Sequence, residues 1–137
     1  MIALTLPQCV AEICRLHDFF QEWFNGTIAA SDGNFQRFAS VMDPNFVIIG
    51  PNGALTDLPT LTTGLHNAYG KEPGVRIWTE QHRLHHQENG LALCTYAEWQ
   101  QTVAHTTAAL EQRSLRSAAD APHGIVWLHV HETWIET

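Results

Sequence analysis

The second half of the chain is the feature that most restricts the possible folds. From residue 75 onward, long segments rich in β-branched and aromatic residues alternate with turn signals. The triplet ENG at 88–90 is typical of a β-hairpin, and DAPHG at 120–124 marks a later turn. Together these signals predict an antiparallel meander of four strands. The predicted strands cover residues 75–87, 91–103, 107–119 and 125–136.

Both faces of these strands carry large apolar side chains. In the segment 91–103, Leu93 and Trp99 lie on one face, whereas Cys94 and Tyr96 lie on the other. Antiparallel sheets in small proteins usually leave one face polar and exposed to water. A sheet that is apolar on both faces needs two covers, which are its own helices and a second subunit. We therefore expect a homodimer that forms through the sheet face.

The first half predicts three helices, and a short strand at 46–50 separates the second helix from the third. Apolar residues recur in the first helix at the spacing of one buried face. Pro7 suits its first position, and Asp57 is a cap for the third helix. The predicted helices cover residues 7–26, 31–42 and 57–70. No repeat or linker is evident, so the 137 residues predict a single domain.

Net charge and cysteine content indicate which binding partners and which cellular compartment to expect. The formal net charge is −7 and Lys71 is the only lysine, so nucleic acid and acidic membrane surfaces would be repelled. The three cysteines lack a ligand spacing, which favours reduced thiols in a cytoplasmic protein. The opening MIALTLPQCV lacks the pattern of a secretory signal, and no stretch approaches a membrane span of about 20 apolar residues. We find no phosphate loop or G-x-S-x-G motif, and no cofactor is predicted.

The order of these elements resembles the nuclear transport factor 2-like superfamily. The segments FQEWFNG, DPNFVIIGPNG, LHNAYG, LALCTYAEWQ and WLHVHETW span nearly the whole chain. They resemble the SnoaL-like members and the calcium/calmodulin-dependent kinase II association domain. The resemblance implies one SnoaL-like domain over 1–137 with an α+β, cystatin-like barrel: a cone-shaped, curved antiparallel sheet with N-terminal helices packed on its concave face. Members include enzymes, binding proteins and assembly modules, so the fold alone does not assign a function.

The resemblance also suggests candidate site residues. When TYAEW and HVHET are matched to the pocket strands of the association domain, Glu98 and Glu132 fall where that family carries arginines. This difference argues against the same acidic ligands. Tyr69 falls at an aromatic pocket wall, and strand alternation adds residues from the concave face, with Trp127 on the outside. The candidates for ligand binding are Tyr69, Tyr96, Arg113, Arg116 and Val130.

Two carboxylates in a partly apolar cavity allow more than one chemistry. If Glu98 and Glu132 lie close together, one pKa rises and that group can act as a general acid or base. If an arginine lies between them, the three groups form an ion network that stabilises a shape or orients a ligand. Glu98 and Glu132 are therefore the candidate catalytic residues. A single β-bulge would invert the assignment of the faces.

The residues HVHE near the end of the chain include three side chains of metal-binding type, His129, His131 and Glu132. Side chains alternate along a strand, so His129 and His131 share one face and Glu132 points to the other. A joint site of all three is therefore not expected, and no metal is predicted.

Three functions stay open at this point. The first is a protein that binds an unidentified small hydrophobic molecule in a pocket with carboxylates. The second is a cofactor-independent isomerase, dehydratase or hydrolase that uses a pocket glutamate. The third is an oligomerisation module.

Overall fold

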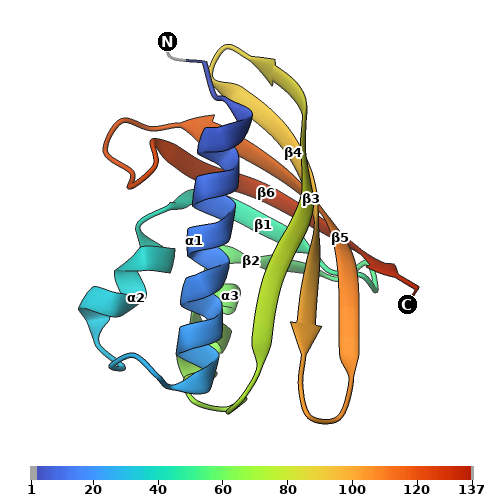
Figure 1. The fold of residues 1–137 in the computed structure, drawn as a ribbon. Helices are drawn as coiled ribbons and strands as arrows, with labels where there is room; N and C mark the ends of the chain where they lie inside the picture. The colour runs from blue at the N-terminus through green and yellow to red at the C-terminus, as the bar shows by residue number, and fades with distance from the viewer. Residues whose placement is uncertain (1–2, 137) are drawn as a thin grey trace.

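A computed structural model describes residues 3–136 and contains three helices and six strands (Figure 1). The elements in chain order are α1 (Leu6–Asn25), α2 (Asp32–Ala39), β1 (Met42–Ile49), β2 (Leu55–Asp57), α3 (Leu58–Asn67), β3 (Arg76–Glu88), β4 (Leu91–Gln101), β5 (Thr106–Ser117) and β6 (Ile125–Ile135). The three predicted helices and the four-stranded meander are all present.

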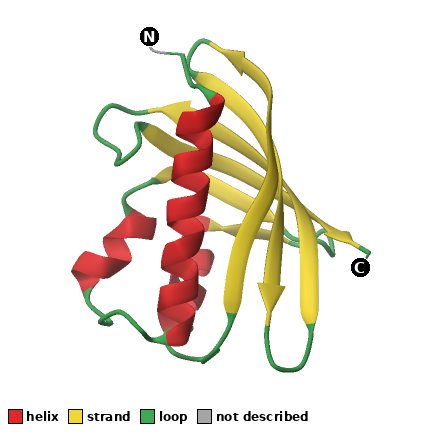
Figure 2. Cartoon of the chain, in the orientation of Figure 1, coloured by secondary structure: helices red, strands yellow, loops and turns green. Residues whose placement is uncertain are grey.

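The strands form one curved, unclosed sheet in the order β2-β1-β6-β5-β4-β3, and α1 crosses its concave side (Figures 1 and 2). The predicted α+β fold is confirmed. Every neighbouring pair is antiparallel except β1 and β6, which run parallel. Parallel pairing joins segments far apart in sequence and leaves no local turn signal, so the sequence did not indicate it. The three-residue β2 is too short to show a periodicity.

The helix ends follow from local chemistry. Thr5 caps α1 in a capping box with Gln8, and Gly26 ends the helix at φ +72°, a left-handed conformation that favours glycine. Asp57 caps α3 by accepting a hydrogen bond from the Thr60 amide at 3.0 Å. At the β3–β4 turn, Asn89 and Gly90 both have positive φ, as a two-residue hairpin turn of the primed type requires.

A β-bulge in β6 changes which side chains reach the concave face. Ser114 pairs with His129 and Leu115 pairs with Trp127, so Leu128 is an extra residue in β6. Trp127 and Val130 are both fully buried, and the Trp127 indole reaches α1. The expectation that Trp127 lies on the outside was therefore wrong, because strict alternation does not hold across the bulge.

Glu12 is a buried carboxylate that joins distant parts of the fold. Its side chain is 0% exposed and accepts hydrogen bonds from Arg37 of α2 (2.7 and 3.3 Å) and from the Trp127 indole of β6 (2.8 Å). The His123 imidazole Nδ1 lies 2.9 Å from the same carboxylate. Glu12 thus ties α1 to α2, to β6 and to the turn that precedes β6.

Among residues 3–136, no helix is long and apolar enough to cross a membrane.

Candidate ligand-binding site

A cavity of about 210 Å³ lies between the helices and the sheet. Its walls are mainly apolar, and four polar side chains, Glu98, Gln100, Arg113 and Glu132, also line it. Aromatic and aliphatic groups come from all three helices and from β1. They include Phe20, Phe24, Phe38, Phe46, Leu61 and Leu65.

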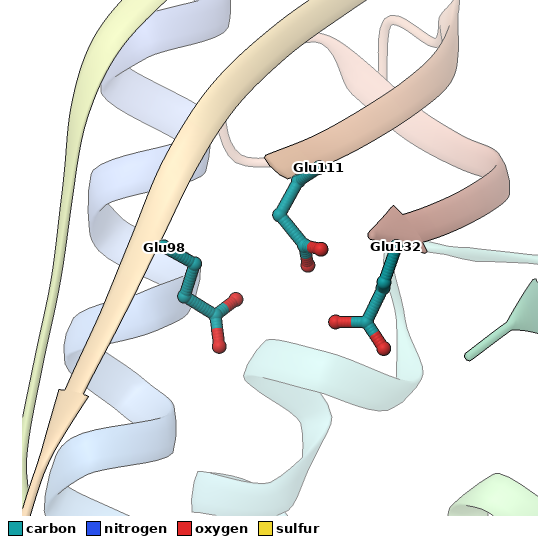
Figure 3. Close-up of side chains that lie close together, drawn as sticks. All are labelled: Glu98, Glu111 and Glu132. Carbon is teal, nitrogen blue, oxygen red and sulfur yellow. The ribbon is translucent and has the colours of Figure 1, made fainter. Parts of the chain in front are cut away.

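Strand register brings the polar groups together. Tyr96 of β4 pairs with Glu111 of β5, which pairs with Glu132 of β6, so these three form one row on the concave face. Arg113 and Glu98 lie in the adjacent rows on either side. The carboxylates of Glu98, Glu111 and Glu132 point toward one another, and one oxygen of each lies within 4.8 Å of the others (Figure 3).

Glu98 is held as an ionised carboxylate. One oxygen lies 2.8 Å from His17 Nε2, and the other accepts a hydrogen bond from Gln100 at 2.7 Å. His17 is itself oriented by α1, because its Nδ1–H donates to the Ile13 carbonyl at 2.7 Å. Burial alone would raise the pKa of Glu98, but His17, Arg113 and Gln100 outweigh it and lower that pKa to about 2.

Arg113 is the buried cation of the site. Its guanidinium lies over the Trp127 ring, with its central carbon 4.9 Å from the ring centroid. Nε donates to the Tyr96 hydroxyl and one NH₂ group donates to Glu111, each at 2.7 Å. Burial works against the charge, yet Tyr96, Glu111 and Glu98 outweigh it and hold the pKa of Arg113 above its ordinary value.

The pKa of Glu111 is shifted in the opposite direction to that of Glu98, although both side chains belong to the same cluster. Burial comes first, and repulsion by Glu98 and Glu132 adds to it, so the pKa of Glu111 rises to about 10 despite the attraction of Arg113. Glu111 therefore carries a proton at neutral pH. Glu98 and Glu111 thus differ in protonation state over a wide pH range.

Glu111 and Glu132 are linked through the proton of Glu111. Glu111 Oε2 is buried and accepts no hydrogen bond from the described residues. Because Glu111 is protonated and its Oε1 already accepts from Arg113, Oε2 carries that proton and donates it to Glu132, which forms no ion pair within residues 3–136. Three carboxylates at this spacing are the one group of this kind found in residues 3–136 that could hold a metal ion.

A second, smaller hollow of about 160 Å³ shares Glu98, Gln100 and Glu132 with the cavity. Its remaining wall includes Pro51 and the Trp134 side chain, which is 61% exposed. The carboxylates therefore stand between an apolar interior and an exposed aromatic ring.

The structure brings together four of the predicted site residues, Tyr96, Glu98, Arg113 and Glu132. Tyr69 lies elsewhere: its hydroxyl donates to the Ile28 carbonyl and its ring packs on Trp23. Arg116 forms an ion pair with Asp43 at 3.0 Å and does not line the cavity. Val130 is on the expected face but is fully buried beside Arg113.

Sequence reasoning missed Glu111. Alternation places Glu111 on the same face as Arg113, two residues away, and this was the available signal. The contact between His17 and Glu98 spans 81 residues, so no local pattern could indicate it. His129 and His131 share the outer face, as alternation predicted, and Glu132 points to the cavity.

One protein family matches nearly the whole chain. The family described as "Sucrose-6-phosphate phosphohydrolase C-terminal" matches residues 10–136. Probable sucrose-phosphatase 3a of Arabidopsis thaliana is 21% identical over 127 residues, which cover 91% of this chain and 30% of that protein. The chain therefore spans less than a third of the length of this curated relative.

Solved structures confirm the nuclear transport factor 2-like fold. An NTF-2 like protein of unknown function from Pseudomonas aeruginosa superposes with a TM-score of 0.85 at 21% identity, covering 94% of this chain and 99% of that chain. A CaMKII hub of S. rosetta superposes with a TM-score of 0.70 at 18% identity, covering 98% of this chain and 100% of that chain. A domain with a cystatin-like fold from Nostoc punctiforme superposes with a TM-score of 0.61 at 15% identity, covering 98% of this chain and 81% of that chain. At these identities the likeness concerns the fold alone.

Proposed function

The chain belongs to the sucrose-6-phosphate phosphohydrolase C-terminal family, and we propose that within this family it binds a small organic molecule with an apolar body. The observation that carries the proposal is the cavity of about 210 Å³, whose apolar walls end in a cluster of carboxylates. Its volume exceeds the roughly 150 Å³ of an engineered protein cavity that accepts benzene. A pocket of this kind, apolar with a few converging polar groups, is the usual form of a small-molecule site.

The charges argue against a phosphate ester as the ligand. Among residues 3–136, Arg113 is the one Lys or Arg side chain that lines the cavity, and its guanidinium is engaged by Tyr96 and Glu111. Glu98 and Glu132 would repel a phosphoryl group. The name of the longer Arabidopsis relative concerns a protein of which this chain matches 30%, so a sugar phosphate is not our proposed ligand.

The charge states favour binding over acid–base catalysis. A general base works best when its pKa lies near the working pH. The pKa of Glu98 is about 2 and that of Glu111 about 10, so neither lies near neutrality. The catalytic roles of Glu98 and Glu132 stay predictions.

Blocking the cavity tests the proposed function. We expect benzyl alcohol at 10 mM to raise the melting temperature of the wild-type protein by a few degrees, because ligand binding to the folded state adds RT ln(1 + [L]/Kd) to stability. Leu61→Trp places an indole in the cavity and is expected to abolish the shift. Thr63→Trp, on the exposed side of α3, is the matched control. An equal shift in Leu61→Trp, or a shift with sucrose 6-phosphate and none with benzyl alcohol, would refute the proposal.

The outer sheet face supports a second candidate role in assembly. Leu93, Leu110 and Ile135 form an outer-face patch that lines a shallow hollow, and they are 40%, 40% and 37% exposed. Exposed apolar residues that lie together commonly mark an interface. The similarity to a CaMKII hub supports the proposal that a second copy of this chain covers the patch.

We expect the protein to sediment as a dimer at 50 µM, and Leu110→Glu to shift it to a monomer. A buried glutamate in an isologous interface faces apolar surface and, across the symmetry axis, its own copy, so it costs several kcal/mol. Leu55→Glu, at a 63% exposed leucine of β2, serves as the control and should leave the mass unchanged. A wild-type monomer at this concentration would rule out the dimer.

A further inference from the structure

The polar end of the cavity places an open hydrogen-bond donor beside two acceptors, and this deepens the proposed function, on which the inference rests. We infer that the ligand carries a neutral primary carboxamide on its apolar body. The carboxamide oxygen accepts from Arg113, and its two N–H bonds donate to Glu98 and Glu132. The ligand class is thus a small amide with an aromatic or aliphatic body.

The first support is an open donor on a buried cation. The Arg113 side chain is 8% exposed. Its Nε and Nη2 donate to Tyr96 and Glu111, but its Nη1 forms no hydrogen bond with residues 3–136. Nη1 is nevertheless not fully enclosed by protein atoms, so it is open to the cavity that Arg113 lines. Because a guanidinium donates and never accepts, Nη1 lacks an acceptor that a ligand can supply.

The second support is the pair of acceptors beside this donor. Glu98 Oε1 lies 3.8 Å from Arg113 Nη2, and one oxygen of Glu98 lies within 4.8 Å of one oxygen of Glu132. A carboxylate has about four acceptor positions, so both groups keep free ones beside the contacts described above. One NH₂ group with N···O distances of about 2.9 Å reaches two oxygens up to about 5 Å apart.

The geometry of an amide suits a donor and acceptors this close together. Its oxygen and nitrogen are held in one plane about 2.2 Å apart. A single carboxamide can therefore accept from the guanidinium of Arg113 and donate to the carboxylates at the same end of the cavity.

The third support is the charge of the cavity end. An anionic head group would be repelled by Glu98 and Glu132. A cationic head group would be repelled by the Arg113 guanidinium and would leave Nη1 without an acceptor. A hydroxyl group has one donor and serves only one of the two carboxylates, whereas a primary carboxamide is neutral and has one acceptor oxygen and two donors.

The cavity has room for this group beside an aromatic ring. Its volume of about 210 Å³ exceeds by about 60 Å³ that of the engineered cavity that accepts benzene. Because a water molecule occupies about 30 Å³ in the liquid, the extra space holds about two groups of that size, such as the oxygen and the nitrogen of an amide. Phe20, Phe24 and Phe38 line the apolar part that remains for the body of the ligand.

Probes that share one ring test the head group. Benzamide, acetophenone and benzoate have nearly the same shape, but acetophenone lacks the donors and benzoate is an anion. Their dissociation constants are measured by calorimetry at pH 7, together with those of benzylamine and benzyl alcohol. We expect benzamide to bind at least ten times more tightly than acetophenone, since hydrogen bonds to charged groups are the stronger ones. Benzylamine and benzyl alcohol should bind more weakly than benzamide, and benzoate most weakly of all.

Variants assign the two sides of the head group. Arg113→Lys keeps the charge but removes Nη1, so benzamide and acetophenone should each lose about tenfold in affinity. Glu132→Gln exchanges a charged acceptor for a neutral one and should weaken benzamide about fivefold and acetophenone by less than about twofold. Circular dichroism checks that each variant folds, and Glu132→Gln keeps the test decisive if Arg113→Lys does not.

Two exposed positions of β3 provide the matched controls. Arg83→Lys and Glu80→Gln make the same exchanges far from the cavity wall and should change none of the dissociation constants.

The outcomes separate the two levels of the proposal. Equal affinity for benzamide and acetophenone, or a preference for benzoate or benzylamine, overturns the carboxamide assignment and leaves the cavity as a site for another head group. An unchanged benzamide affinity in either folded variant also overturns the assignment. An absence of binding by every probe, benzyl alcohol included, overturns the proposed function together with this inference.

Discussion

Replacing Glu12 by alanine is expected to lower the free energy of unfolding by about 3–5 kcal/mol, the range for removing one partner of a buried ion pair. The substitution leaves the buried Trp127 indole N–H without its acceptor and removes the anion that Arg37 and His123 contact. It also creates a cavity beneath α1. The measurement is urea unfolding at pH 7, followed by circular dichroism.

The control for Glu12→Ala is Asp18→Ala on the same helix. Asp18 forms a loose pair with Arg15 at 3.9 Å, and its side chain is 55% exposed, so the loss should stay within about 0.5 kcal/mol. Glu12→Gln keeps an acceptor for the Trp127 indole, so its loss in the free energy of unfolding should lie between those of Glu12→Ala and Asp18→Ala. A loss below about 1 kcal/mol in Glu12→Ala would show that the network contributes little to stability.

Replacing Glu111 by glutamine is expected to stabilise the protein at alkaline pH, by on the order of 5 kcal/mol at pH 8. Burial and two neighbouring carboxylates raise the folded-state pKa of Glu111 from 4.5 to about 10. Between these values the folded chain holds a proton that the unfolded chain has released. Stability due to this group is therefore fully present below pH 4.5 and is lost as the pH rises toward 10.

Glutamine mimics the protonated carboxyl group without binding a proton, so this pH dependence should disappear. The measurement is urea unfolding of wild type and Glu111→Gln at pH 5 and pH 8, and the difference between them should be small at pH 5. Glu80→Gln, at an exposed site of β3, should follow the wild type at both values. If Glu111→Gln loses stability with pH as steeply as the wild type, Glu111 is ionised in the folded state.

Much of the architecture follows from local sequence. The ENG turn, the cap at Asp57 and the long strands are encoded within a few residues, so pattern reasoning found them. The parallel β1–β6 pair depends on residues about 80 positions apart and could not be found in that way. Relatives of known structure supply this information because they share the fold.

The site could be predicted only in part. The sequence left open whether Glu98 and Glu132 lie close together; their carboxylates do converge, with Arg113 beside Glu98. Arg113 and Arg116 are three residues apart in β5, so strand alternation alone places their side chains on opposite faces of the sheet. The bulge at Leu128 was not predictable, because a single inserted residue has no periodic signature, yet it decides that Trp127 faces Arg113.

The Glu12 network also has a consequence for the order in which the chain folds. Glu12 and its partners His123 and Trp127 are separated by 111 and 115 residues. During synthesis α1 emerges early, but its buried carboxylate finds these two partners only after β6 has been made. Contacts of such long range close slowly and late. The first helix to be synthesised is therefore among the last elements to reach its final position.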